Sequence, residues 1–176
     1  KGGTVCLAPG VYDVGQGLRI DRARSVRLHG QGPATVLIGR QTVLTIERSI
    51  AVRVDDLAMI GGRGATPAVR MRSVVDTSIE ETVVVSFGAG AEVAMRTRSF
   101  GSAIEMSGVV ATSNITGNVL VGEIGIESGG SDKLALVTAG LRIDANVVVG
   151  LASAIAVGGR TAHLIACRID DNEVLA

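Results

Sequence analysis

The sequence predicts an all-β fold in which the chain winds into a parallel β-helix of about six coils, with three short strands in each coil. The first observation is a recurring pattern of apolar, variable and apolar residues, followed by two mostly polar residues and a turn residue. The second apolar residue lies at positions 28, 54, 79, 115, 143 and 169, so four of the five intervals are 25 to 28 residues long. The second observation is that short β-branched runs alternate with glycine and polar turns, without an amphipathic helix of useful length. Such strands are expected to stack in parallel at about 4.8 Å.

The elements of a coil follow one another in a constant order. The first strand of each coil contains the recurring pattern, which occupies Val26–Gln31, Val52–Leu57, Thr77–Thr82, Ser113–Asn118, Leu141–Asn146 and Cys167–Asn172. A second strand follows the turn residue, as in Val83–Val85, Val119–Val121 and Val147–Val149. A third, alternating strand precedes the next copy of the pattern, as in Leu44–Ile46, Val69–Met71, Ile104–Met106, Ile124–Ile126 and Ile155–Val157.

Side chains alternate across a strand, so both apolar residues of the pattern are expected to point inward. These inward pairs include Val26/Leu28, Val52/Val54, Leu141/Ile143 and Cys167/Ile169. Cys167 is therefore expected to be a core residue, whereas Cys6 lies in the first strand, several coils away. Because coils are about 4.8 Å apart, the two residues exceed the ~7 Å Cα separation that a disulfide allows. No disulfide is expected between them.

The residues that flank the second apolar position are expected to point outward in two columns. The column before this position contains Arg27, Arg53, Ser78, Asn114, Arg142 and Arg168. The column after it contains His29, Asp55, Glu80, Thr116, Asp144 and Asp170. A second set of acidic residues follows at Asp56, Glu81 and Asp171.

Two interpretations of these columns remain open. In the first, arginines offset the repulsion between acidic side chains about 4.8 Å apart on adjacent strands. In the second, the columns form a groove in which Asp55, Glu80 and His29 are catalytic candidates and Arg27 and Arg53 bind substrate carboxylates. No cofactor is expected under the first interpretation, whereas under the second the acidic side chains could hold Ca²⁺ or act as acid and base. The first is preferred, because exposed ion pairs are common and individually weak.

Two sequence features resemble the right-handed parallel β-helix proteins of the pectate-lyase type. One is the opening segment Gly2–Tyr12, followed by Leu28–Leu37, which is similar to a glycine-containing turn of those proteins. The other is the repeated Ile-x-x-Asn pattern that places Asn118, Asn146 and Asn172 in register. The resemblance implies a right-handed solenoid with a ladder of stacked asparagines. It implies no single activity, because this superfamily includes lyases, hydrolases, epimerases, tail-spike proteins, adhesins and inert scaffolds.

The longest interval contains an insertion between Val85 and Ile104, which includes Phe87, Arg96 and Arg98. Loops that project from a scaffold commonly build binding sites, so Arg96 and Arg98 are further candidates for substrate binding. The alternative is a longer turn whose phenylalanines pack against the body.

Composition excludes several classes of function. The formal net charge is zero, whereas a nucleic-acid binder needs surplus Lys and Arg. The mean hydropathy is +0.42, yet no apolar run is long enough to span a membrane. Aromatic residues make up 2%, which leaves few platforms for stacking on sugar rings. Residues 1–176 are expected to form one domain, a segment of a longer β-helix that contacts further coils of its parent chain.

Three functions are compatible with these observations. The preferred one is a scaffold or binding domain that faces a polysaccharide and contains no complete catalytic set. The second is a carbohydrate-active enzyme, a lyase or epimerase acting on uronate polymers. The third is a structural component similar to a tail spike, which would be a homotrimer. The resemblance implies an extracellular or cell-surface location for each of them.

Overall fold

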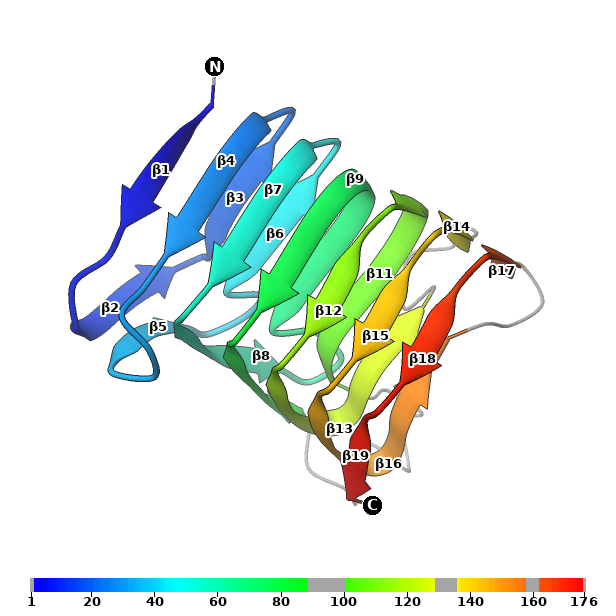
Figure 1. Cartoon of the computed structure of the whole chain (residues 1–176). Helices are drawn as coiled ribbons and strands as arrows, with labels where there is room; N and C mark the ends of the chain where they lie inside the picture. Colours follow the sequence, from blue (N-terminus) through cyan, green and yellow to red (C-terminus); the bar gives the residue numbers. More distant parts are fainter. Residues whose placement is uncertain (1, 89–100, 129–135, 158–161, 176) are drawn as a thin grey trace.

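The computed structural model describes residues 2–88, 101–128, 136–157 and 162–175, and its β-strands wind into a solenoid (Figure 1). Within these residues, every regular element is a strand and every strand pairing is parallel. The solenoid has about six turns, which confirms the predicted fold class and repeat number. No helix long and apolar enough to cross a membrane occurs in these residues.

The strands form three stacks, named A, B and C in chain order within a coil. Stack A contains β1 (Gly3–Cys6), β4 (Arg24–His29), β7 (Ile50–Asp55), the second half of β9 (Val69–Glu80), the end of β11 (Ser102–Ala111), β12 (Asn114–Thr116), β14 (Leu136–Ala139), β15 (Arg142–Asp144), β17 (Ala162–Ile165) and β18 (Arg168–Asp170). Stack B contains β2 (Gly10–Gly15), β5 (Thr35–Gly39), β8 (Ala58–Arg63), β10 (Val83–Gly88), the starts of β13 (Val119–Ser128) and β16 (Val147–Ala156), and β19 (Glu173–Leu175). Stack C contains β3 (Leu18–Asp21), β6 (Leu44–Glu47), the first halves of β9 and β11, and the ends of β13 and β16.

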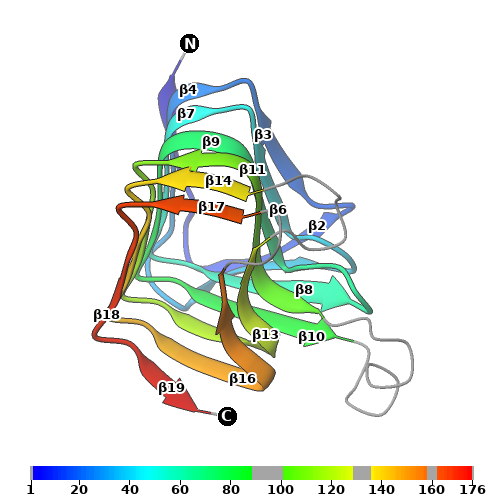
Figure 2. The same cartoon turned by 90° about the vertical axis from the view of Figure 1, so that its right-hand side faces the viewer.

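The solenoid is right-handed, as Figure 2 shows along its axis from the C-terminal end. In this view β17 runs leftward across the top, β18 runs down the left side and β19 runs rightward along the bottom. The chain thus turns counterclockwise while it advances toward the viewer, because the coils progress from blue at the back to red at the front.

The interior is filled by aliphatic side chains, as the alternation predicts. Val52, Val54, Leu141 and Ile143 are buried, and the third strands bury their own alternate residues. Ile169 also follows the inward register, but it is 50% exposed because no described coil covers β18. Cys167 packs against the core, and both Cys167 and Cys6 are free thiols.

The predicted asparagine ladder is present at the turn between stacks A and B. Asn118 receives hydrogen bonds from Thr82 in the preceding coil, and its own amide donates to Asn146 Oδ1 at 2.9 Å. Asn146 in turn donates to Asn172 Oδ1 at 2.8 Å. Each asparagine also donates to a backbone carbonyl of the previous coil, for example Asn146 to Ile115 at 2.9 Å. The ladder therefore satisfies polar groups that are buried at the last three turns between stacks A and B.

The insertion lies where predicted, between β10 and β11. The chain enters it at Gly88 and returns at Gly101, whose N–H donates to the buried Glu123 carboxylate at 2.7 Å. Phe87 is 63% exposed, so the expectation that it packs against the body is wrong. Side chains alternate between the two faces of β10. Val84 and Ser86 face inward, so Phe87 faces outward. Arg96, Arg98 and Phe100 lie outside the described residues.

Candidate functional site

The two predicted outward columns exist on stack A. The register pairs Arg27 with Arg53 and His29 with Asp55, and it continues through the later coils. Parallel in-register stacking places equivalent side chains one strand spacing apart, about 4.8 Å. The structure therefore brings together Arg27, His29, Arg53, Asp55 and Glu80, as the sequence predicted.

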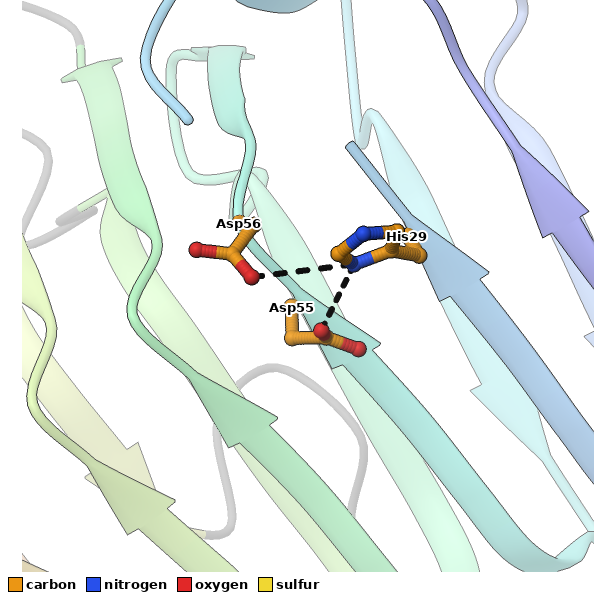
Figure 3. Close-up of side chains that lie close together, drawn as sticks. All are labelled: His29, Asp55 and Asp56. Carbon is orange, nitrogen blue, oxygen red and sulfur yellow. Dashed lines mark hydrogen bonds and ion pairs between the residues drawn. The ribbon is translucent and has the colours of Figure 1, made fainter. Parts of the chain in front are cut away.

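Asp55 is the centre of this group, and Figure 3 shows its contact with His29 beside Asp56. Arg27 donates to both of its carboxylate oxygens, from Nε to Oδ1 at 2.9 Å and from Nη2 to Oδ2 at 2.6 Å. His29 donates from Nδ1 to Oδ2 at 2.8 Å, because an ionised carboxylate is only an acceptor. Asp56 lies farther from the same ring nitrogen, at 3.6 Å. The Asp55 side chain is 1% exposed, so these partners cover it completely.

The electrostatics of Asp55 follow from this geometry. The hydrogen bonds from Arg27 lower the pKa of Asp55 to about 2, and His29 adds to the effect while burial opposes it. Arg53 extends the network, since its Nη2 lies 2.9 Å from Glu80 Oε2 and its Nε lies 3.4 Å from Asp55 Oδ1. Both oxygens of Asp55 are thus occupied by cationic donors. A carboxylate held this way is unsuited to binding a metal ion or to accepting a proton near neutral pH.

The ion pairs of these columns were expected to be exposed; this is wrong for Asp55 and Asp144, whereas the Asp170 side chain is 41% exposed. Asp55 and Asp144 are buried, because arginine side chains lie over the outer face of stack A. Arg142 binds Asp144, and Arg168 binds Asp170, within their own strands. The paired charges therefore support the interpretation in which arginines offset the acidic column.

A different feature lies at the turn between stacks B and C, where strand ends surround a depression of about 790 Å³. Its lining includes Asp13, Ile38, Arg40, Arg63 and Phe87. Arg40 and Arg63 are exposed, and no side-chain hydrogen bond or ion pair of theirs exists within the described part of the chain. This sets them apart from Arg27, Arg53, Arg142 and Arg168 of stack A, each of which pairs with a carboxylate. The depression thus presents two guanidinium groups beside an exposed aromatic ring.

Two carboxylates form a second unpredicted group on the outer face of stack C. Glu105 and Glu127 occupy neighbouring positions on adjacent coils. Glu105 is 1% exposed and contacts Arg70, with Arg70 Nε 3.3 Å from Glu105 Oε1. Burial, together with repulsion from Glu105, raises the pKa of Glu127 above its ordinary value. The pair therefore contains one carboxylate beside an arginine and one whose pKa is raised.

Sequence reasoning missed both groups for different reasons. The two glutamates could have been predicted to point outward. Side chains alternate along a strand, and each glutamate follows an inward-facing isoleucine in Ile104-Glu105-Met106 and Ile126-Glu127. Arg40 follows the end of β5 and Arg63 ends β8, and the conformation of the turn after each strand determines that both side chains line the depression. No periodicity of the sequence specifies that geometry.

The sequence was compared with protein-family models and with curated proteins. No protein-family model matches the sequence, and no curated protein matches it either.

Proposed function

We propose that this chain is a β-solenoid scaffold that binds an acidic polysaccharide in the depression between stacks B and C. The observation that carries the proposal is the pair of guanidinium groups, Arg40 and Arg63, that have no ion-pair partner within the described residues. Acidic polysaccharides are polymers of the cell surface and its surroundings, so the proposal includes an extracellular or surface location.

The chemistry of the lining supports this class of ligand. A guanidinium group presents a planar fork of donors that matches a carboxylate or a sulfate, and it stays charged at every physiological pH. Phe87 offers an exposed face for the apolar side of a sugar ring. Ile38 extends the apolar part of the lining. Asp13 opposes anion binding, but its Oδ1 already accepts a hydrogen bond from the Gly15 N–H at 2.8 Å.

The test is isothermal titration of the chain with oligogalacturonate and with a neutral oligosaccharide of the same length. The acidic oligosaccharide should bind and the neutral one should not. Replacing both Arg40 and Arg63 with Gln should weaken binding at least about tenfold, because each charge-assisted contact contributes about 1.5–3 kcal/mol. The double variant Arg22→Gln/Arg24→Gln removes the same charge from exposed residues outside the depression and is the matched control. Equal binding of the neutral ligand, or unchanged affinity of the Arg40/Arg63 variant, would refute the proposal.

The Glu105–Glu127 pair favours a second candidate, acid–base catalysis on a uronate polysaccharide. A carboxyl group with a raised pKa can donate a proton to a glycosidic oxygen, and here its neighbour Glu105 lies beside Arg70. A screen of uronate polymers, with and without Ca²⁺, would detect turnover. Activity that Glu127→Gln abolishes and Asp55→Asn preserves would establish this candidate. If turnover is absent, or survives Glu127→Gln, acid–base catalysis by Glu127 is excluded for those polymers.

A further inference from the structure

We propose that Cys6 is a nucleophilic thiol that forms a mixed disulfide with a small disulfide compound. His29 takes up the thiol proton, and Asp55 positions His29. These three residues occupy one column of stack A, because the register pairs Cys6 with His29 and His29 with Asp55. A nucleophile, a proton acceptor and an acidic partner therefore lie side by side on β1, β4 and β7. None of them lines the depression between stacks B and C.

The register directs Cys6 to the outer face of the solenoid. Its neighbour Val5 pairs with Leu28, whose side chain is buried in the core. Because side chains alternate along a strand, Cys6 points outward, and its thiol is exposed and free. Figure 1 shows β1 beside β4, with β7 on the other side of β4. Parallel strands are about 4.8 Å apart, so the Cys6 and His29 side chains are neighbours on this face.

His29 lies between the thiol and two carboxylates. Its Nδ1 donates to Asp55 Oδ2 at 2.8 Å, and Asp56 Oδ2 lies 3.6 Å from the same nitrogen (Figure 3). A neutral imidazole that carries its proton on Nδ1 has its lone pair on Nε2. Within the described residues, Nε2 has no hydrogen-bond partner. A proton that reaches Nε2 produces an imidazolium facing the two carboxylates, which stabilise its charge.

Arg27 acts on the same thiol from the neighbouring column. Its hydrogen bonds to Asp55 raise the pKa of Arg27, and the charges of Asp56 and of a Cys6 thiolate make smaller contributions in the same direction. The attraction is mutual, so Arg27 also stabilises the thiolate. Since Arg27 already donates to Asp55 at 2.9 and 2.6 Å, its role is supporting, and His29 is the group that accepts the proton.

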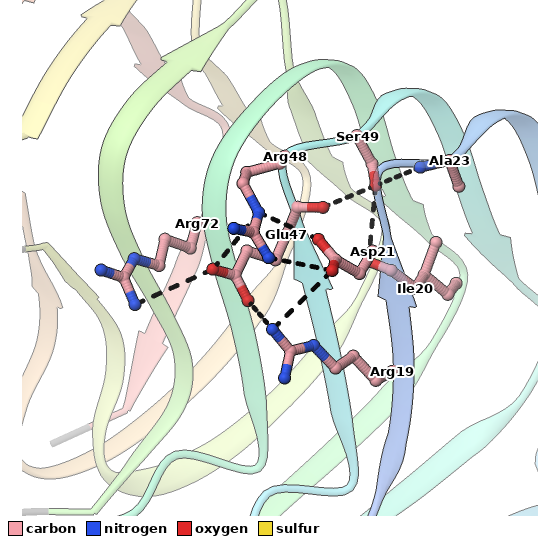
Figure 4. A network of polar contacts seen from close by, with 8 residues as sticks. All are labelled: Arg19, Ile20, Asp21, Ala23, Glu47, Arg48, Ser49 and Arg72. Atoms are coloured by element: carbon pink, nitrogen blue, oxygen red, sulfur yellow. Dashed lines mark hydrogen bonds and ion pairs between the residues drawn. The ribbon is translucent and has the colours of Figure 1, made fainter.

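A network at the turn between stacks C and A provides a contrast (Figure 4). There Arg48 donates to Asp21 at 3.0 and 2.9 Å, and Arg19 donates to Glu47 at 2.6 Å. Arginine stays charged at every physiological pH, so these pairs hold carboxylates without taking up a proton near neutrality. Histidine can take one up in that range, which distinguishes the column of Cys6 and His29.

The contact between thiol and imidazole requires one rotation. No hydrogen bond joins Cys6 to His29 in the described part of the chain. The Cys6 Sγ turns about a single bond, and we expect the staggered rotamer directed at β4 to bring it within hydrogen-bonding distance of His29. Hydrogen bonds of reactive groups are often long until the reacting molecule binds.

The reaction is thiol–disulfide exchange. The Cys6 thiol gives its proton to His29 Nε2, and the thiolate attacks one sulfur of the disulfide R–S–S–R. The S–S bond of that compound breaks, a Cys6–S–S–R bond forms, and the leaving thiolate takes the proton from His29 to become R–SH. The disulfide is the oxidant, so no other is needed. Cys167 is several coils away and cannot displace the adduct, which therefore persists.

An acyl group suits this thiol less well than a disulfide does. Acyl transfer needs donors for an oxyanion, and the backbone N–H that follows the nucleophile commonly supplies one. The Leu7 N–H follows Cys6 and already donates to the His29 carbonyl at 2.8 Å. Disulfide exchange develops no oxyanion and does not need that donor.

The experiment measures how fast bis(2-hydroxyethyl) disulfide modifies Cys6, by peptide mass spectrometry after the remaining thiols are trapped. This compound does not titrate, so the pH dependence belongs to the protein. At pH 7 the wild-type chain should react at least about threefold faster than His29→Gln; the gain is limited because a more readily ionised thiol is a weaker nucleophile. At about pH 9.5 accessible thiols ionise unaided, so the ratio should fall to one or below.

Asp55→Asn tests the positioning role. It keeps an acceptor for His29 Nδ1 and removes the charge, so it should slow the reaction at pH 7 less than His29→Gln does. The difference from wild type should again disappear at about pH 9.5. A loss of folding alone would not produce this pH dependence.

Three controls accompany these variants. His163→Gln makes the same substitution at the other histidine, on β17, and should leave the Cys6 rate unchanged. Arg40→Gln/Arg63→Gln should also react at the wild-type rate, which separates this reaction from polysaccharide binding. Far-ultraviolet circular dichroism checks that each variant is folded.

A pH profile of the unmodified chain provides a test without mutation. A thiol that lacks a proton acceptor reacts about tenfold more slowly for each pH unit below its ionisation range, whereas Cys6 should slow by less between pH 7 and pH 6. The charged groups that face the pair are Arg27, Arg53, Asp55 and Asp56. A full tenfold loss, equal wild-type and His29→Gln rates at pH 7, or a difference between them that persists at about pH 9.5 would overturn the proposal.

Discussion

Among individual residues, Asp55 is the one whose position in the repeat, buried contacts and lowered pKa together link the sequence to the pH dependence of stability. It lies outside the solenoid interior, yet Arg27 and His29 exclude it from water and hold it as a carboxylate. A charge removed from water is stable only when such partners are present. Removing the carboxylate therefore affects the folded state more than removing an exposed acid would.

We predict that Asp55→Asn lowers the free energy of unfolding at pH 7 by about 2 kcal/mol, the equivalent of a pKa lowered from 3.8 to about 2. Because the folded-state pKa is the lower one, this stabilisation is complete above the unfolded pKa near 4 and disappears as the pH falls through about 2. Urea denaturation at a series of pH values from 7 to 2 measures it.

The matched control is Asp76→Asn, because Asp76 is exposed and asparagine tolerates its positive φ of 51°. The control should retain the wild-type loss of stability in acid, whereas Asp55→Asn should show a smaller one. If the two variants behave alike, Asp55 is not the source of the acid sensitivity.

The sequence predicts the neighbours of such residues better than it predicts their exposure. Register follows from the repeat, so the group of Arg27, His29, Arg53, Asp55 and Glu80 could be predicted from spacing. The burial of Asp55 could not be predicted in this way, because it depends on the conformation of the long Arg27 side chain that covers it. The unpaired state of Arg40 and Arg63 likewise depends on turn geometry.

Among the elements, the turn from stack A to stack B repeats its backbone conformation in five coils. A residue with positive φ occupies it in successive coils, at Asp56, Glu81, Gly117, Ala145 and Asp171. Residues other than glycine incur a cost of about 1–2 kcal/mol in this conformation. An asparagine follows this residue at Asn118, Asn146 and Asn172, and by binding the backbone of two coils the ladder offsets that cost at Ala145 and Asp171. The ladder was predictable from the repeated asparagines, whereas the positive φ at Glu81 and Ala145 was not.

We predict that Asn146→Ala lowers the free energy of unfolding by about 3 kcal/mol. The substitution leaves the buried Ile115 carbonyl and the Asn118 N–H without partners, and each unsatisfied group costs about 1–3 kcal/mol. Chemical denaturation monitored by circular dichroism measures the change. Asn114→Ala, on the outer face of the neighbouring coil, is the control and should change stability by less than about 0.5 kcal/mol. Equal effects of the two substitutions would show that the ladder contributes nothing specific.

For the whole molecule, stability is a sum of contacts between neighbouring coils. The central coils bury their apolar residues, while the first and last described coils expose several, among them Val5, Val11, Ile165 and Val174. Local unfolding is therefore expected to begin in the first and last described coils and to proceed toward the central coils.

Hydrogen exchange followed by mass spectrometry tests this expectation. Amides of β1–β3 and β17–β19 should exchange at least about tenfold faster than those of β7, β9 and β12 under native conditions. The terminal variant Val174→Ala should speed exchange in the last coils and leave the first coils unchanged. A single exchange rate throughout the described residues would instead indicate one cooperative unit.

The overall architecture was the most predictable feature, because one pattern repeated six times specifies the strand order, the inward face and the ladder together. The depression between stacks B and C was the least predictable. It depends on where several coils place the ends of long side chains, and a repeat pattern does not encode those positions.

The stacking of coils along one axis also determines how the molecule would respond to mechanical load. Tension applied between its first and last coils acts along the same direction as the hydrogen bonds that join the strands. One terminal coil can then peel away while the rest of the rod stays intact. Most detachments would release about 26 residues, or roughly 90 Å of extended chain, and the coil that contains the insertion would release more, so the rod would lengthen in steps and absorb work at each one.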